Sequence, residues 1–204
     1  MERAARANNY LIKYGYINFI RKLIYLFIQW LSALLHFFRR CRFYFRTRCW
    51  IRSIGTGVVI RGIGNRIKFG KDSVLYEKVV IEISEDAKLH VGEQFILSYG
   101  GLIACHHSIE IGNHVMIGEY TSIRDTTHDY GNANLVFVNQ PNISGPIKIG
   151  SNVWIGRGCI IFPHTIIEDD VIVGANSIVK GYLKSNSIYA GAPLKLRNKL
   201  YSKE

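Results

Sequence analysis

The sequence predicts a mainly β fold, a parallel β-helix preceded by a helical N-terminal segment. Two observations predict the β-helix: an aliphatic residue recurs at every sixth position towards the C-terminus, and a small or β-branched residue follows four places after most of these. The aliphatic series is Ile149, Ile155, Ile161, Ile167, Val173 and Val179, and the second series is Val153, Cys159, Thr165, Val171 and Ser177. A six-residue period is too short for a helical or leucine-rich repeat and matches the hexapeptide pattern of β-helices.

Each hexapeptide is expected to form one short strand and a turn, so that three hexapeptides close one triangular coil. The aliphatic residue should point inward, and the small residue should fit the crowded corner. The same register returns upstream in shorter runs, beginning with Phe69, Leu75 and Ile81, and turn bulges can absorb the phase slips between runs. We therefore assign residues 53–187 to the β-helix, with roughly five coils between residues 67 and 181 at a spacing of about 4.8 Å. Residues 188–204 are expected to form a C-terminal tail.

Residues 1–52 form a basic and apolar segment that we expect to be helical. They hold eleven Lys and Arg against one acidic residue, whereas the rest of the chain holds fifteen against fourteen. An apolar run from Leu23 to Phe38 lies between Arg21-Lys22 and Arg39-Arg40. Three interpretations stay open: a helix in the membrane interface, a helical subdomain packed on the β-helix or a partner, and a transmembrane anchor. The charges flank the apolar run and do not alternate with it, so no nucleic-acid partner is expected.

The four cysteines are widely separated, at Cys41, Cys49, Cys105 and Cys159, without the spacing of a metal site. Reduced thiols in a cytoplasmic protein are the simple interpretation. The expected location is therefore cytoplasmic, with peripheral contact at the inner face of the cytoplasmic membrane if the N-terminal segment binds lipid.

The repeat stops between Ile123 and Ile149, which predicts an extended loop over residues 124–148. Long loops on a rigid scaffold are often functional. This loop contains His128, and an imidazole that titrates near neutrality can accept a proton from an alcohol and return it to a leaving group. We therefore predict that His128 is catalytic and that Asp125 or Asp129 orients its ring. A purely structural role in the loop base is the alternative.

Three segments together resemble the hexapeptide-repeat acyltransferases, close to the galactoside, maltose and colanic-acid-type O-acetyltransferases. They are the Thr127–Tyr130 sequence THDY, the stretch IGSNVWIGRGCIIFPHTIIEDDVIVGANSIV and the terminal AGAPLKLRNK. The resemblance covers residues 90–199 by motif and residues 55–90 by pattern alone.

The resemblance implies a homotrimer of left-handed β-helices with active sites between subunits and acetyl-CoA as co-substrate. It implies that His128 is the general base, that Trp154 lies near the acyl and acceptor groups, and that Asp125, Asp129 and Tyr130 belong to the same site. Gly156, Gly174 and Ala175 match positions that approach the pantetheine arm, and Lys180, Lys195 and Arg197 match the region that meets the nucleotide phosphates. The chain departs from the family at Lys180-Gly181, where Thr-Lys is usual, and at Gly100-Gly101, near where the small-sugar enzymes carry an asparagine.

The predicted function is acetyl transfer from acetyl-CoA to a hydroxyl of a bacterial surface glycan or its lipid-linked precursor. Acetylation of small free sugars, or N-acetylation of an amino sugar, is the alternative within the same chemistry. Two alternatives of other classes are a non-catalytic membrane-associated scaffold and a trimeric metal enzyme that gathers histidines of adjacent chains, with His106, His107, His114, His128 and His164 available. No metal is expected, because no pair of histidines has a recognised ligand spacing. His106 and His107 are interpreted as surface turn residues, with lining of the acceptor cleft as the alternative, and His164 is interpreted as an outward-facing turn residue.

Overall fold

The computed structural model describes residues 2–62 and 66–200. The chain divides into two compact units, Met1–Arg39 and Arg40–Glu204. One continuous helix, α1 (Glu2–Thr47), forms the described part of the first unit and contributes its last two turns to the second. In the part of the chain that the structure describes, the segment Tyr16–Thr47 is long and apolar enough to cross a membrane.

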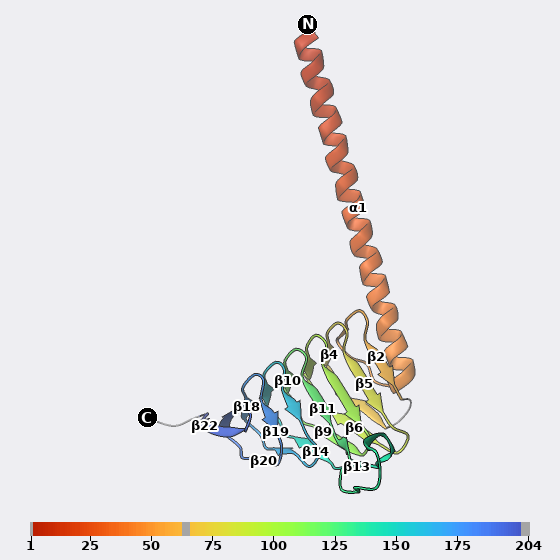
Figure 1. Cartoon of the computed structure of the whole chain (residues 1–204). Coiled ribbons are helices and arrows are strands. Elements are labelled where there is room, and N and C mark those ends of the chain that lie inside the picture. The colour runs from red at the N-terminus through yellow and green to blue at the C-terminus, as the bar shows by residue number, and fades with distance from the viewer. Residues whose placement is uncertain (1, 63–65, 201–204) are drawn as a thin grey trace. The chain divides into compact units, whose positions relative to one another are not determined.

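Short parallel strands build the second unit as a stack of coils with three flat sheets (Figure 1). The first sheet has the order β1-β4-β7-β10-β15-β18-β21-β22, the second β19-β16-β11-β8-β5-β2 and the third β20-β17-β14-β9-β6-β3. The strands of the first sheet are β1 (Ser53–Ile54), β4 (Val74–Leu75), β7 (Ile96–Leu97), β10 (Met116–Ile117), β15 (Trp154–Ile155), β18 (Val171–Val173), β21 (Ser187–Ala190) and β22 (Lys195–Lys199). Those of the second are β2 (Val59–Arg61), β5 (Val80–Ile83), β8 (Leu102–Cys105), β11 (Ser122–Arg124), β16 (Ile160–Ile161) and β19 (Ile178–Val179). Those of the third are β3 (Ile67–Phe69), β6 (Lys88–Val91), β9 (Ser108–Ile111), β14 (Ile147–Ile149), β17 (Ile166–Ile167) and β20 (Tyr182–Leu183).

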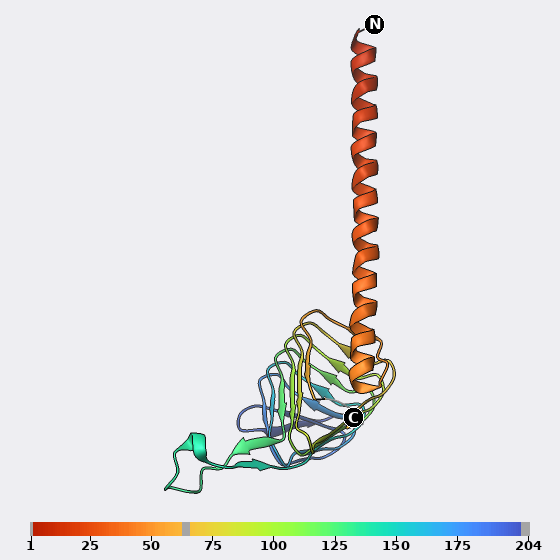
Figure 2. The same ribbon diagram turned by 90° about the vertical axis from the view of Figure 1, so that its right-hand side faces the viewer.

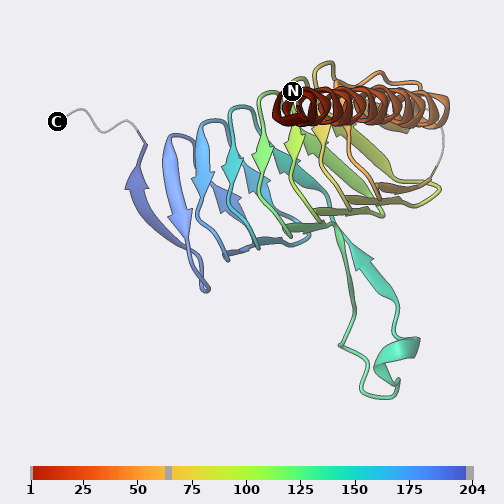
Figure 3. The ribbon, with the colours of Figure 1, turned by 90° about the horizontal axis from the view of Figure 1, so that it is seen from above.

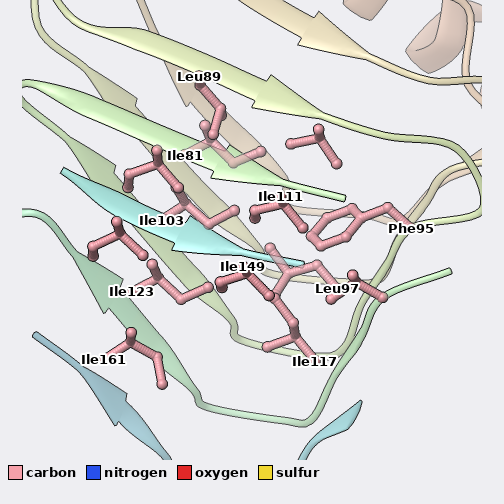
Figure 4. Packing of buried hydrophobic residues seen from close by; sticks show 14 of the residues in the cluster. Ile81, Leu89, Phe95, Leu97, Ile103, Ile111, Ile117, Ile123, Ile149 and Ile161 are labelled. Carbon is pink, nitrogen blue, oxygen red and sulfur yellow. The ribbon is translucent and has the colours of Figure 1, made fainter. Parts of the chain in front are cut away.

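The inward side chains form one continuous apolar core along the stack (Figure 4). All six aliphatic residues of the hexapeptide series, from Ile149 to Val179, are buried, and so are the five small residues from Val153 to Ser177. Strand residues alternate between the core and the outside because successive side chains of a strand point to opposite faces. The predicted parallel β-helix of hexapeptide repeats with an N-terminal helix is thus confirmed.

Residues 67–181 contribute five strands to each of the three sheets, in agreement with the predicted five coils, and strands outside this range complete a sixth coil. The early coils hide part of the repeat because they contain more than eighteen residues. Val74 pairs with Ile96, 22 residues later, whereas Trp154 pairs with Ile172, 18 residues later. The additional residues lie in the corners, where they shift the phase of the sequence pattern without disturbing the pairing.

Both ends of the coil stack are covered by chain that is not hexapeptide repeat. At the start, Phe43 from the last turns of α1 is buried and packs edge-on against Phe69, with ring centroids 5.5 Å apart. Arg40 donates to the carbonyl of Ile51 at 2.9 Å and lies over the ring of Trp50. At the other end, β22 pairs antiparallel with β21, so residues 188–190 and 195–199 of the expected tail instead belong to the first sheet.

Candidate active site

The loop at residues 124–148 leaves the coil stack as a two-stranded hairpin (Figures 2 and 3). Strand β12 (Thr126–His128) pairs antiparallel with β13 (Asn142–Ser144), which places His128 opposite Asn142. The base of the hairpin is closed by the backbone N–H of Gly145, which donates to the carbonyl of Asp125 at 2.8 Å. His128 therefore lies on a hydrogen-bonded ladder, close to the rigid stack.

The distal part of the hairpin holds the short 3₁₀ turn η1 (Phe137–Asn139). The amide of Gln140 donates to the carbonyls of Asn132 at 3.0 Å and Leu135 at 3.3 Å, which fixes this turn. Apolar side chains nevertheless remain exposed there, among them Phe137, Val138 and Tyr130, the last being 81% exposed. An exposed apolar tip of this kind is typical of a surface that meets another chain or a ligand.

A cavity of about 420 Å³ lies between the hairpin and the outer face of the second sheet. His128 lines it, together with Arg124 and Ser122 of β11 and with His106 from the turn after β8. Thr126, Thr127, Asn142, Ile160, Ile161, Phe162 and Pro163 complete the lining. Within the described chain, no protein group is hydrogen-bonded to the His128 imidazole, so both ring nitrogens are available to a substrate. The cavity thus combines an imidazole, the Arg124 guanidinium and hydroxyl groups.

Asp125 has a structural role that the sequence did not indicate. Its side chain is fully buried, and its two carboxylate oxygens accept hydrogen bonds from the backbone N–H groups of His106, His107 and Ser108 at 2.7 to 2.9 Å. Asp129 accepts from the backbone N–H of Gly131 at 2.9 Å. The expectation that one of these carboxylates orients the His128 ring is therefore corrected: Asp125 fixes the turn of the preceding coil, and Asp129 fixes the local turn of the hairpin.

The structure places His106 in the cavity, which is the alternative that the sequence left open beside a surface turn. Its Nδ1 lies 2.8 Å from the hydroxyl oxygen of Ser84, and its backbone is held by Asp125. Arg124 was missed by the sequence analysis. It could have been found from its position, because it is the last outward-facing residue before the repeat breaks.

The other histidines lie apart from this cavity. His107 is exposed, and His114 Nδ1 lies 3.0 Å from the side-chain oxygen of Gln94. The ring of His164 lies directly over Gly145, at the base of the hairpin. Across residues 2–62 and 66–200, no group of three or more His, Cys, Asp and Glu side chains is arranged to hold a metal ion.

The two buried cysteines are poor nucleophiles. Burial, reinforced by the neighbouring Asp125, raises the pKa of Cys105 to about 12, and burial also raises the pKa of Cys159. A thiol attacks as its thiolate, so at neutral pH both side chains are inert and serve as small apolar residues of the coil.

Trp154 lies on a different face of the same chain. It projects from β15 in the first sheet, is 51% exposed, and lines a second hollow of about 750 Å³ with Met116, His114 and Arg52 among others. His128 is beside the second sheet, so one chain alone does not bring these two predicted site residues together.

Gly156, Gly174 and Ala175 lie at one corner of consecutive coils. A Cβ added at Gly156 would be 2.6 Å from the backbone nitrogen of Ala175, and one added at Gly174 would be 2.8 Å from the Cβ of Ala190. Coil stacking by itself therefore requires glycine at both positions. The predicted phosphate-binding residues lie further along: Lys180 follows β19, and Lys195 and Arg197 are exposed on β22.

Comparison with known proteins finds the same repeat and the same fold. Residues 146–181 match the family described as bacterial transferase hexapeptide (six repeats). The chain is 28% identical over 201 residues to the putative lipopolysaccharide biosynthesis O-acetyl transferase WbbJ of Escherichia coli, which covers 92% of this chain and 91% of that protein. It is 30% identical over 116 residues to the galactoside O-acetyltransferase of Escherichia coli, over 57% of this chain and 56% of the relative.

Two solved structures show the likeness in three dimensions. A galactoside acetyltransferase in complex with coenzyme A superimposes with a TM-score of 0.53 at 25% identity, over 72% of this chain and 65% of that one. A variant of AntD, an N-acyltransferase from Bacillus cereus in complex with dTDP-4-amino-4,6-dideoxyglucose and coenzyme A, superimposes with a TM-score of 0.62 at 20% identity, over 75% and 81% of the two chains. The latter likeness concerns the fold. The resemblance predicted from the motifs is confirmed: the chain carries the bacterial transferase hexapeptide repeat and is similar to O-acetyltransferases.

Proposed function

We propose that the protein transfers an acetyl group from acetyl-CoA to a sugar hydroxyl of a bacterial surface glycan or of its lipid-linked precursor. The observation that carries the proposal is the unpartnered imidazole of His128 at the edge of the hairpin cavity. The similarity to a putative lipopolysaccharide O-acetyl transferase over nearly the whole chain supports the choice of acceptor.

In the proposed reaction, His128 removes the proton from the acceptor hydroxyl while the hydroxyl oxygen attacks the carbonyl carbon of the thioester. The C–S bond then breaks, and the imidazolium returns the proton to the departing thiolate, so the histidine ends as it began. A positioned base of this kind contributes about 10²- to 10⁴-fold in rate. The inert Cys105 and Cys159 thiols agree with direct transfer that forms no acyl-enzyme.

We further propose that the working form is a homotrimer in which a neighbouring chain supplies Trp154 to the His128 cavity. The observations that support it are the separate faces of the two residues and the apolar side chains on the outer surface of the stack. Met116, Trp154, Ile160, Ile166 and Ile178 are each 43 to 51% exposed. Sedimentation velocity should show a species of three times the chain mass, and a monomer that retains full turnover would contradict the proposal.

The CoA-binding assignments are part of the same proposal. Gly156, Gly174 and Ala175 would allow the pantetheine arm to approach the coil backbone, and Lys180, Lys195 and Arg197 would meet the nucleotide phosphates. Because a ligand that binds only the folded state stabilises it, CoA should raise the melting temperature, and Lys180→Ala combined with Arg197→Ala should reduce the rise.

The first test is CoA release from acetyl-CoA by the wild-type protein and by His128→Ala, with polymeric, lipid-linked and free sugars and an amino sugar as acceptors. His107→Ala is the matched control, because His107 is exposed and does not line the cavity. We expect His128→Ala to lose at least 100-fold in turnover and His107→Ala to keep it. Equal activity in the two variants would refute the catalytic role, and a preference for the amino sugar would favour N-acetylation.

We also propose that the enzyme works at the inner face of the cytoplasmic membrane, where lipid-linked acceptors are made. The basic and apolar residues 1–52 support this location.

A further inference from the structure

The part of α1 between Tyr16 and Phe38 exposes an unusual amount of apolar surface. Many of its side chains are large, mainly apolar and at least half exposed, namely Tyr16, Phe19, Leu23, Ile24, Leu26, Phe27, Ile28, Trp30, Leu35, Phe37 and Phe38. None of the 18-residue apolar window within Tyr16–Thr47 is buried. Soluble helices keep one face for the core and leave a broad polar face in water, so this segment requires an apolar surrounding.

The polar residues of the segment are nevertheless ordered in one stripe. They succeed one another at steps of four and three residues: Asn18, Lys22, Tyr25, Gln29, Ser32, His36 and Arg39. A mean step of 3.5 residues is close to the 3.6 residues of a helical turn, so the stripe drifts by only about 20° per heptad and stays on one side. Within it, the amide of Gln29 donates to the hydroxyl of Tyr25 at 2.7 Å, which joins two consecutive members.

Basic residues lie at both ends of this segment. Residues 23–38 contain no charged side chain, while Arg21 and Lys22 precede them and Arg39, Arg40 and Arg42 follow. A helix that crosses a bilayer would place one basic cluster on each side, against the preference for Lys and Arg on the cytoplasmic side. A helix that lies along the surface places both clusters on the same side, where anionic lipid phosphates attract them.

We propose that residues 16–39 bind an anionic lipid surface with the helix axis in the membrane plane, the polar stripe towards the headgroups and the remaining faces in the acyl region. The narrow stripe explains why the helix is apolar over most of its circumference and still polar along one line. The inference specifies how the protein binds the membrane at the proposed location. Only the purpose of this binding, which is to hold the enzyme on the surface that carries a lipid-linked acceptor, rests on the proposed function.

The test uses the full chain and flotation with vesicles of phosphatidylcholine alone or mixed with phosphatidylglycerol. Two variants carry the same new charge at different places: Gln29→Lys lies on the stripe, and Leu34→Lys lies about 140° around the helix from it. We expect binding to the mixed vesicles that weakens with salt, unchanged or tighter binding for Gln29→Lys, and at least a tenfold loss for Leu34→Lys.

Three other outcomes would overturn the inference. If Gln29→Lys abolishes binding or trimer formation while Leu34→Lys does not, the stripe faces other copies of the helix. If protease added outside the vesicles leaves the residues before Tyr16 intact, the helix crosses the bilayer. If neither vesicle binds the protein, the segment has no affinity for lipid. The CoA-induced rise in melting temperature, measured on the same samples without vesicles, separates each of these from a failure of the proposed enzyme function.

Discussion

A carboxylate oxygen of Asp125 lies 2.7 Å from the backbone nitrogen of His106. The residue that begins the hairpin therefore also fixes the turn of the preceding coil, which delivers the second histidine to the cavity. His128 follows Asp125 by only three positions, so this single buried carboxylate helps to position the imidazoles of both His106 and His128.

Replacing Asp125 should destabilise the fold and disturb the cavity together. Asp125→Ala removes a charged acceptor from three backbone N–H groups, and hydrogen bonds to charged groups contribute more than neutral ones. We expect the free energy of unfolding, measured by urea denaturation, to fall by about 3 kcal/mol. Asp129→Ala, which removes one exposed hydrogen bond, should change it by less than about 1 kcal/mol. Equal effects of the two substitutions would show that the Asp125 contacts contribute little.

The corner glycines can be tested for a structural role separate from ligand binding. Gly156→Ala would place a Cβ 2.6 Å from the Ala175 backbone, whereas Gly131→Ala in the hairpin meets nothing closer than 3.3 Å. Overpacking of this kind costs about 1 to 3 kcal/mol. We expect a lower melting temperature without CoA for Gly156→Ala and no change for Gly131→Ala. A Gly156→Ala protein of normal stability that loses only CoA affinity would instead indicate direct contact with the ligand.

Stability should fall at alkaline pH because of Cys105. Its pKa rises from the ordinary value of 9.0 to about 12 in the folded state, chiefly through burial. Between these two values the unfolded chain has lost the thiol proton and the folded chain retains it, so the thiol's contribution is complete below pH 9 and disappears as pH rises towards 12. Chemical denaturation at several pH values should show a steeper decline for wild type than for Cys105→Ala. If the free energy of unfolding declines equally with pH in the two proteins, the Cys105 thiol does not cause the loss of stability.

Arg124 should contribute to acceptor binding. It lines the cavity with His128 and is the residue that precedes Asp125 on the outer side of β11. We expect Arg124→Ala to raise KM for a phosphate-bearing acceptor about tenfold, the loss typical of one charged hydrogen bond. Arg157→Ala is the control, because Arg157 is exposed and does not line this cavity. An unchanged KM with lower kcat would place Arg124 at the reacting atoms instead.

The hexapeptide series predicted the scaffold well because its cause is local. In each coil, the residue equivalent to Ile155 must point inward and the residue equivalent to Cys159 must fit a corner. Each repeat therefore carries the same sequence pattern. The early coils obscured that signal, since their longer corners shift the spacing between Val74 and Ile96 away from a multiple of six.

The site was less predictable because its contacts cross between coils. The sequence identified His128 from the break in the repeat. It did not show that the Asp125 carboxylate would accept a hydrogen bond from the turn at His106, nineteen residues earlier in the chain. Nor did it show that Trp154 would project from a different sheet than the one beside His128. The sheet that a residue occupies depends on the number of strands between it and His128.

The hairpin enters and leaves the stack without altering the coils around it. β11 remains paired with β8 and β16, and β14 remains paired with β9 and β17, as though the intervening residues were absent. Their length and chemistry are consequently free to vary between descendants of this fold. Changes in the hairpin beyond the His128–Asn142 pair could therefore alter the acceptor preference without moving the base or the coils around it.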